Sequence, residues 1–151
     1  MDDRLSQIQI RLMEQEDIQA LADLEREVFS TPWSYDSLYE ELSNPLAAFF
    51  VACDGAKPIG YIGMHYIIDE GYVTNIVVAP EYRRQGIARR LLRTALEFSE
   101  ENALAFLSLE VRKSNDIAID FYRSEDFEIT GERKNFYTNP SESAYIMTRR
   151  L

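Results

Sequence analysis

Cysteine, histidine and long apolar runs are nearly absent from this sequence. Its 151 residues include one cysteine, Cys53, and one histidine, His65. A single cysteine cannot form an internal disulfide, and without a Cys/His cluster we expect no metal site. No apolar run is long enough to cross a bilayer, and residues 1–4 lack the features of a secretory signal. We therefore expect a cytoplasmic protein without a membrane span, in which Cys53 and His65 are ordinary strand residues.

Positive charge is also scarce. Lysine and arginine together number 16 against 26 aspartates and glutamates, which gives a net charge of −10. A general nucleic-acid binder needs a basic surface that displaces counterions from phosphates. The charge balance argues against a direct nucleic-acid partner and favours a cationic one.

Repeats, low-complexity tracts and flexible linkers are absent too, so we expect residues 1–151 to form one domain. Apolar residues at alternating spacing predict strands and those at helical spacing predict helices. Strands 49–53 and 59–67 should form a hairpin across Asp54-Gly55, and Ser34 should cap the second helix. The remaining expected strands are 8–12, 72–78, 105–111, 127–133 and 144–148, and the expected helices are 18–28, 34–42, about 87–96 and 115–124.

This element order indicates a mixed α/β (α+β) fold. We expect a mostly antiparallel sheet of about seven strands, flanked by about four helices. The helix between strands 72–78 and 105–111 makes that central pair parallel.

The segment Arg83-Arg84-Gln85-Gly86-Ile87-Ala88 lies between an expected strand end and a helix start. Unpaired backbone N–H groups and the positive end of the helix dipole suit a phosphate there, and Gly86 allows close approach. The charges of this helix reverse what its dipole favours, because Arg83, Arg84, Arg89, Arg90 and Arg93 precede Glu97, Glu100 and Glu101. A bound pyrophosphate would explain this arrangement, and a solvated basic face is the alternative.

The expected strand 105–111 carries a carboxylate opposite an apolar face. Its alternation places Leu107, Leu109 and Val111 on one side and Glu110 on the other. In the helix that follows, Asn115 is suited to the N-cap, and Tyr122 lies about two turns further on the same face. Both side chains could contact one extended ligand. The alternatives are a half-exposed polar strand face for Glu110 and core packing for Tyr122.

The turn resembles the Arg/Gln-x-x-Gly-x-Gly/Ala signature of the GCN5-related N-acetyltransferases (GNAT), and it follows Asn75-Ile76-Val77-Val78-Ala79-Pro80 at the family's spacing. The resemblance implies the GNAT fold, in which the central parallel pair splays and acetyl-CoA lies in the V. The backbone of Ile76, Val77 and Val78 would then contact the acetyl-pantetheine arm. The pyrophosphate would lie against Arg83, Arg84, Gln85, Gly86, Ile87, Ala88 and Arg89.

A second resemblance covers almost the whole chain. Leu109-Glu110-Val111-Arg112-Lys113-Ser114-Asn115 with Tyr122 is similar to a segment of the ribosomal-protein alanine N-acetyltransferases, the RimI group, and Pro32-Trp33-Ser34 and Arg133-Lys134-Asn135-Phe136-Tyr137 also fit. The match implies that Glu110 is the general base, Tyr122 the general acid and Asn115 a cofactor contact.

The acceptor implied by this second resemblance is the N-terminal peptide of a ribosomal protein. We expect Trp33 and Tyr137 to flank that acceptor, because aromatic side chains suit the gripping of a short peptide. Three departures from the group's pattern fall near this region. Asp126 replaces a glycine at a helix end, Phe136 replaces a tyrosine, and Glu142-Ser143-Ala144 replaces Glu-Asp-Ala.

An α-amine, with a pKa of about 7.7 to 8.0, is easier to deprotonate at pH 7 than a lysine, with a pKa of about 10.4. We therefore expect direct acetyl transfer from acetyl-CoA in a ternary complex, with Glu110 as base, a backbone N–H near Val78 stabilising the oxyanion and no metal. Two alternatives stay open: an acetyltransferase for small amines or lysine side chains, and a non-catalytic CoA-binding domain. We expect a monomer or weak dimer.

Overall fold

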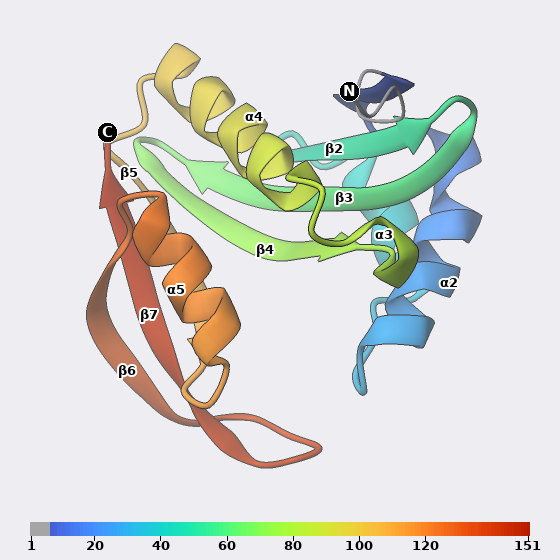
Figure 1. The fold of residues 1–151 in the computed structure, drawn as a ribbon. Helices are drawn as coiled ribbons and strands as arrows, with labels where there is room; N and C mark the ends of the chain where they lie inside the picture. The colour runs from blue at the N-terminus through green and yellow to red at the C-terminus, as the bar shows by residue number, and fades with distance from the viewer. Residues whose placement is uncertain (1–6) are drawn as a thin grey trace.

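The computed structural model describes residues 7–151, so the segment on which we argued the lack of a secretory signal lies outside it. Helices and strands follow one another along the chain in the expected order (Figure 1). The strands are β1 (Ile8–Leu12), β2 (Ala47–Asp54), β3 (Lys57–Ile67), β4 (Glu70–Val78), β5 (Phe106–Arg112), β6 (Glu128–Tyr137) and β7 (Glu142–Arg150). The helices are α2 (Ile18–Val28), α3 (Tyr35–Glu41), α4 (Ile87–Glu101) and α5 (Asp116–Ser124), with short 3₁₀ turns η1 (Gln15–Asp17) and η2 (Pro80–Tyr82).

All the described strands form one seven-stranded sheet in the order β1-β2-β3-β4-β5-β7-β6. The pair β4–β5 is parallel and the other pairs are antiparallel, as expected. The parallel pairing covers only Glu70↔Phe106, Gly71↔Leu107 and Tyr72↔Ser108. Beyond Tyr72, β4 and β5 separate, which confirms the splayed central pair.

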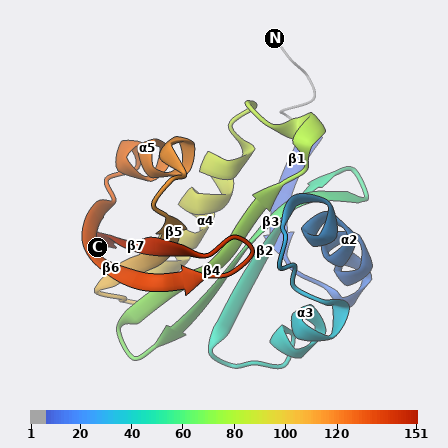
Figure 2. The same ribbon diagram turned by 90° about the horizontal axis from the view of Figure 1, so that it is seen from below.

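The helices cover the two faces of this sheet. Helices α2 and α3 pack on one face and α4 packs on the other (Figure 2). The apolar face of α4 is buried as its spacing predicts, through Ile87, Leu91, Leu92, Ala95 and Leu96. Helix α5 lies beside the start of α4, near the open end of the parallel pair (Figure 1).

Local signals in the sequence correctly predict several turns and caps. The Ser34 side chain accepts a hydrogen bond from the Ser37 N–H and caps α3, and the Asn115 side chain accepts one from the Ala118 N–H and caps α5. Gly55 has φ +62° in the β2–β3 turn. Asp126 has φ +67° after α5, so aspartate takes the left-handed conformation at a position where glycine is favoured.

The main boundary difference is at β6, which continues to Tyr137 rather than ending near 133. Its last residues pair with β7 after a register shift between Arg133 and Tyr137, and a pairing of this kind leaves no local pattern. Cys53 is buried in β2 and His65 lies in β3, as expected for strand residues. Within residues 7–151, no helix is both long and apolar enough to cross a membrane.

Candidate functional site

The turn before α4 has the backbone geometry expected of an anion site. Gly86 is the N-cap with φ +79°, and it offers no side chain to the first N–H groups of the helix. A Cβ built on Gly86 meets no atom within 4 Å, so the backbone faces open space. Arg84 also has a positive φ of +64°, which is uncommon for a residue with a Cβ. The buried Gln85 Oε1 atom has no hydrogen-bond partner among the described residues, so an acceptor is left over beside the turn.

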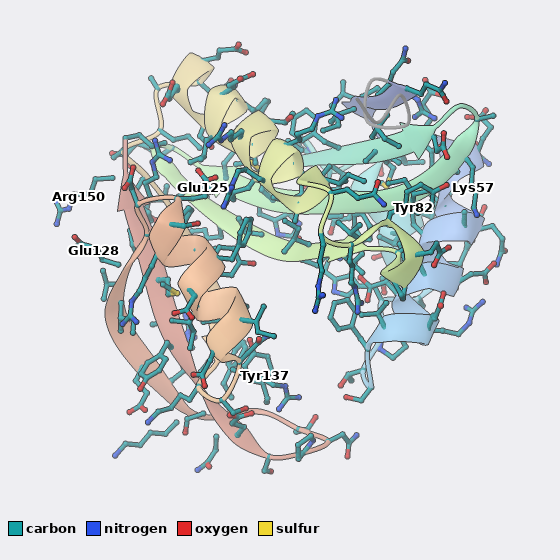
Figure 3. All side chains as sticks on the ribbon, in the orientation of Figure 1. Lys57, Tyr82, Glu125, Glu128, Tyr137 and Arg150 are labelled. Carbon is teal, nitrogen blue, oxygen red and sulfur yellow. The ribbon has the colours of Figure 1, made fainter. Side chains whose placement is uncertain are left out.

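The arginines of this end of α4 do not all face the turn. Arg89 Nε lies 2.6 Å from Glu125 Oε1, and Arg93 lies 3.3 Å from the same oxygen. Glu125 is labelled in Figure 3, at the end of α5 that lies beside α4. Arg90 donates to the Ile8 carbonyl at 2.9 Å. Glu125 therefore compensates the positive charges of Arg89 and Arg93 near the start of α4. The sequence of α4 alone did not reveal this partner.

The two arginines that precede Gly86 are less engaged. Arg83 Nε donates to the Val78 carbonyl at 3.4 Å. The Arg84 side chain makes no hydrogen bond or ion pair with residues 7–151. Of the expected phosphate-binding cations, Arg84 is the one whose guanidinium remains uncommitted.

The end of β4 has a backbone edge without a strand partner. Ile76, Val77 and Val78 pair with β3 on one side, but the pairing with β5 stops at Tyr72. Beyond Tyr72, β4 and β5 therefore diverge and leave an opening between them. An extended ligand in the opening can therefore form hydrogen bonds with this edge, as a further strand would.

Glu110 lies on the opposite side of the same opening. It is on the strand face opposite the buried Leu109 and Val111, and its side chain is 26% exposed. Its Oε1 atom lies 3.2 Å from Arg133 Nε on β6. The carboxylate is thus partly accessible, and within residues 7–151 its ion-pair partner is Arg133, a pairing that sequence reasoning missed.

Tyr137 interacts electrostatically with this carboxylate and with Tyr122. Tyr122 is buried, and its burial raises the pKa of its hydroxyl above the ordinary value, with a smaller contribution from Tyr137. Burial raises the pKa of Tyr137 to about 12, and the charge of Glu110 adds to the effect. Both phenols are therefore protonated at neutral pH. Tyr137 of β6 thus interacts with Glu110 of β5 and with Tyr122 of α5, which lie on separate elements.

Arg112 fixes the hairpin that carries Tyr137. Its guanidinium lies 4.4 Å from the centre of the Tyr137 ring. It also donates to the Pro140 carbonyl at 2.9 Å and to the Thr138 carbonyl at 3.1 Å. Sequence reasoning gave Arg112 no role, because these partners are brought to it only by the β5–β7 pairing.

Trp33 lies in the loop between α2 and α3. Its ring packs against Phe49 at 5.9 Å between centres. The same loop contacts the β6–β7 hairpin, because the Ser30 hydroxyl donates to the Asn139 carbonyl at 2.8 Å (Figure 2). The loop of Trp33 and the hairpin of Tyr137 are therefore joined at this point, although the two side chains are not in contact.

Comparison with known proteins agrees with this geometry. The model of the Acetyltransferase (GNAT) family matches residues 18–127. The chain belongs to this family. The match includes the Gly86 turn, Glu110 and Tyr122, while the hairpin that carries Tyr137 lies beyond its end.

Curated GNAT relatives match nearly the full chain. A Bacillus subtilis protein with the provisional name ribosomal protein bS18-alanine N-acetyltransferase is 40% identical over 139 residues, which are 91% of this chain and 92% of that protein. The ribosomal protein bS18-alanine N-acetyltransferase of Escherichia coli is 33% identical over 140 residues, 91% of this chain and 94% of its own.

Solved structures show the same fold. The crystal structure of the Escherichia coli ribosomal-protein-S18-alanine N-acetyltransferase superposes with a TM-score of 0.88 at 31% identity, covering 95% of this chain and 94% of that one. Arabidopsis thaliana NAA60 in complex with acetyl-CoA gives a TM-score of 0.88 at 17% identity, covering 95% of this chain and 99% of its own. At that identity the second likeness concerns the fold alone.

One buried carboxylate near this GNAT site escaped sequence reasoning. Glu25 in α2 is 1% exposed and contacts Trp33, Tyr61 and Asn75. A signal was present in the sequence, because Glu25 occupies a position of the helical spacing that otherwise holds the apolar Ile18, Leu21 and Ala22.

Proposed function

We propose that the protein transfers the acetyl group of acetyl-CoA to the N-terminal α-amine of a protein, and that the acceptor begins with alanine and belongs to the ribosome. The observation that carries this proposal is the position of Glu110 on β5 beyond the last residue that pairs with β4, with Tyr137 interacting electrostatically with both Glu110 and Tyr122. The names of the bacterial relatives support the acceptor. The reaction takes place in the cytoplasm, in a chain that acts as one domain and as a monomer or weak dimer.

The cosubstrate fits the opening on physical grounds. The uncapped first turn of α4, with Gly86 facing open space and the Arg84 side chain uncommitted, offers N–H groups and positive charge to a pyrophosphate. The unpaired edge at Ile76, Val77 and Val78 offers backbone groups to the acetyl-pantetheine arm. Gln85, Ile87, Ala88 and Arg89 complete the turn, and Asn115 lines the start of α5, where its side chain already caps the helix.

The chemistry follows from the positions of the two titratable groups. The neutral amine nitrogen forms a bond to the thioester carbonyl carbon, and Glu110 takes an amine proton through one water. A backbone N–H near Val78 stabilises the oxyanion. As the carbon–sulfur bond breaks, Tyr122 gives its proton to the departing thiolate. Burial keeps the Tyr122 phenol protonated, so it enters the reaction carrying the proton that it donates.

The connected loops support an N-terminal acceptor. The contact between Ser30 and Asn139 joins the loop of Trp33 to the hairpin of Tyr137, so both elements that we expect to flank the peptide are tied together. A chain end can enter such a closed frame, while an internal lysine has to bring its flanking backbone with it. We therefore favour the α-amine over a lysine side chain.

A comparison of two peptides tests the proposal. One peptide begins with a free alanine, and the other has the same sequence with a blocked N-terminus and an internal lysine. We expect acetylation of the first at least about tenfold faster at pH 7, because far more of its amine is neutral. Equal rates would contradict the N-terminal acceptor. Acetyl-CoA binding without turnover on either peptide or on a small polyamine would support a non-catalytic domain instead.

A further inference from the structure

Glu25 is a carboxylate in a position that should be apolar. It lies on the core-facing side of α2 beside Leu21 and Ala22, and only 1% of its surface is exposed. A buried carboxylate is costly unless hydrogen bonds replace its water. No cation among residues 7–151 pairs with it, so its partners are all uncharged donors.

Those donors come from three different segments. The Tyr61 hydroxyl on β3 donates to Glu25 Oε1, and Asn75 Nδ2 on β4 donates to the same oxygen at 3.0 Å. The backbone N–H of Trp33 donates to Glu25 Oε2 at 3.3 Å. Burial and the neighbouring Glu25 raise the pKa of Tyr61, so its hydroxyl remains a donor at neutral pH. One side chain thus joins α2, the sheet and the loop of Trp33.

Asn75, the β4 residue that donates to Glu25, lies beside an irregularity in the pairing of β3 and β4. The β3–β4 register shifts between Gly63 and Met64, opposite Asn75. A Cβ on Gly63 would lie 2.4 Å from the Phe49 ring and 2.7 Å from Asn75 Oδ1, so the packing there requires glycine. Bulges of this kind redirect side chains. Asn75 is directed to Glu25, and the next residue, Ile76, begins the segment that faces the acetyl arm.

We propose that Glu25 is a positioning residue that holds the loop of Trp33 in a fixed position relative to β4. It ties Trp33, on the acceptor side, to Asn75 on β4, the strand whose edge contacts the acetyl-pantetheine arm in the proposed function. This inference rests on the proposed function, which places the peptide at Trp33. It adds a buried carboxylate that acts through the loop and touches neither substrate.

The substitution Glu25→Gln tests this role with little change in size. Glutamine has a single acceptor oxygen. It can accept hydrogen bonds either from Tyr61 and Asn75 or from the Trp33 N–H, but not from both sides of the side chain. We expect the KM for the alanine peptide to rise by about tenfold, the effect of one hydrogen bond to a charged group. The KM for acetyl-CoA should stay within about twofold, since the Gly86 turn is untouched.

Asp17→Asn is the matched control, because Asp17 is a buried carboxylate at the other end of the same helix and pairs with Arg11 away from Trp33. It should lower the thermal midpoint without changing the peptide KM. If Glu25→Gln changes both KM values equally, or behaves like Asp17→Asn, Glu25 is only structural and the inference is wrong.

Trp33 itself provides a readout that does not depend on turnover, since it is the only tryptophan. We expect Glu25→Gln to increase quenching of its fluorescence by acrylamide, because the loop loses its anchor, while Asp17→Asn leaves quenching unchanged. Unchanged quenching in Glu25→Gln would overturn the inference. A wild-type protein that fails to acetylate the peptide would overturn the proposed function, while the fluorescence comparison would still decide the role of Glu25.

Discussion

At the scale of single residues, two glutamates with the same side chain lie in different environments. Glu110 is partly exposed beside Arg133, whereas Glu25 is buried among uncharged donors. The first is accessible to water, whereas the second is enclosed by its hydrogen-bond donors. Burial likewise keeps Tyr122 protonated, as a donor must be before the leaving group departs.

Glu110→Gln preserves the size of the side chain but removes its ability to accept a proton. We expect the rate with the alanine peptide to fall by roughly 10²-fold at pH 7, the usual contribution of a general base. Raising the pH to 9 should restore part of the rate, since an α-amine with a pKa of about 7.7 to 8.0 becomes neutral without help.

The measurement is a pH–rate profile of the wild type and Glu110→Gln. Glu132→Gln serves as control, because Glu132 is a β6 carboxylate that pairs with Lys113 outside the site. A Glu110→Gln profile identical to that of the wild type would exclude Glu110 as the base.

At the scale of elements, the site depends on how segments end. The parallel pairing of β4 and β5 stops after three residue pairs, α4 begins with a glycine that offers no cap, and α5 begins with the Asn115 cap. The first of these ends leaves β4 and β5 unpaired beyond Tyr72. Arg112 and the Ser30–Asn139 contact hold the β6–β7 hairpin in place.

Gly86→Glu tests the start of α4 as the pyrophosphate site. Gly86→Gln is its control, because both side chains meet the same φ of +79° and the same open space, and they differ only in charge. We expect Gly86→Glu to bind acetyl-CoA at least about tenfold more weakly than Gly86→Gln, through repulsion of the phosphates.

Isothermal calorimetry with acetyl-CoA provides the affinities, and thermal unfolding shows whether the two variants are equally stable. Equal affinities in the two variants would place the pyrophosphate elsewhere.

At the scale of the whole molecule, acidic groups outnumber basic ones, and some of them also stabilise the fold. Asp17 joins η1 and α2 to β1 through two hydrogen bonds from Arg11, at 2.7 and 2.9 Å. Its burial would raise its pKa, but the bonds from Arg11 and from the Glu14 N–H outweigh this, and the pKa lies below the ordinary 3.8.

A carboxylate with a lowered pKa stabilises the folded state above its ordinary pKa, and this contribution is lost as the pH falls through the lowered value. Asp17→Asn should therefore lower the thermal midpoint at pH 7. The difference from the wild type should shrink as the pH drops below the ordinary 3.8. Thermal unfolding between pH 7 and pH 3 measures it, and a difference independent of pH would contradict the assignment.

The sequence by itself determined the elements and their order. Apolar spacing gave the strands and the face of α4, and Ser34, Gly55 and Asn115 marked turns and caps, because these signals act within a few residues. It also placed Glu110 opposite the apolar face of its strand. The family motifs then indicated the splayed pair and the acetyltransferase family.

Only the tertiary structure decided which residues from distant segments meet. The pairing of Glu110 with Arg133, of Arg89 with Glu125, and of Glu25 with Tyr61 and Asn75 joins residues far apart in the chain. Such contacts follow from strand register, bulges and helix packing, which no local pattern encodes. The physical reason is that each of these side chains finds its partner only after the sheet has formed and the helices have packed on its two faces.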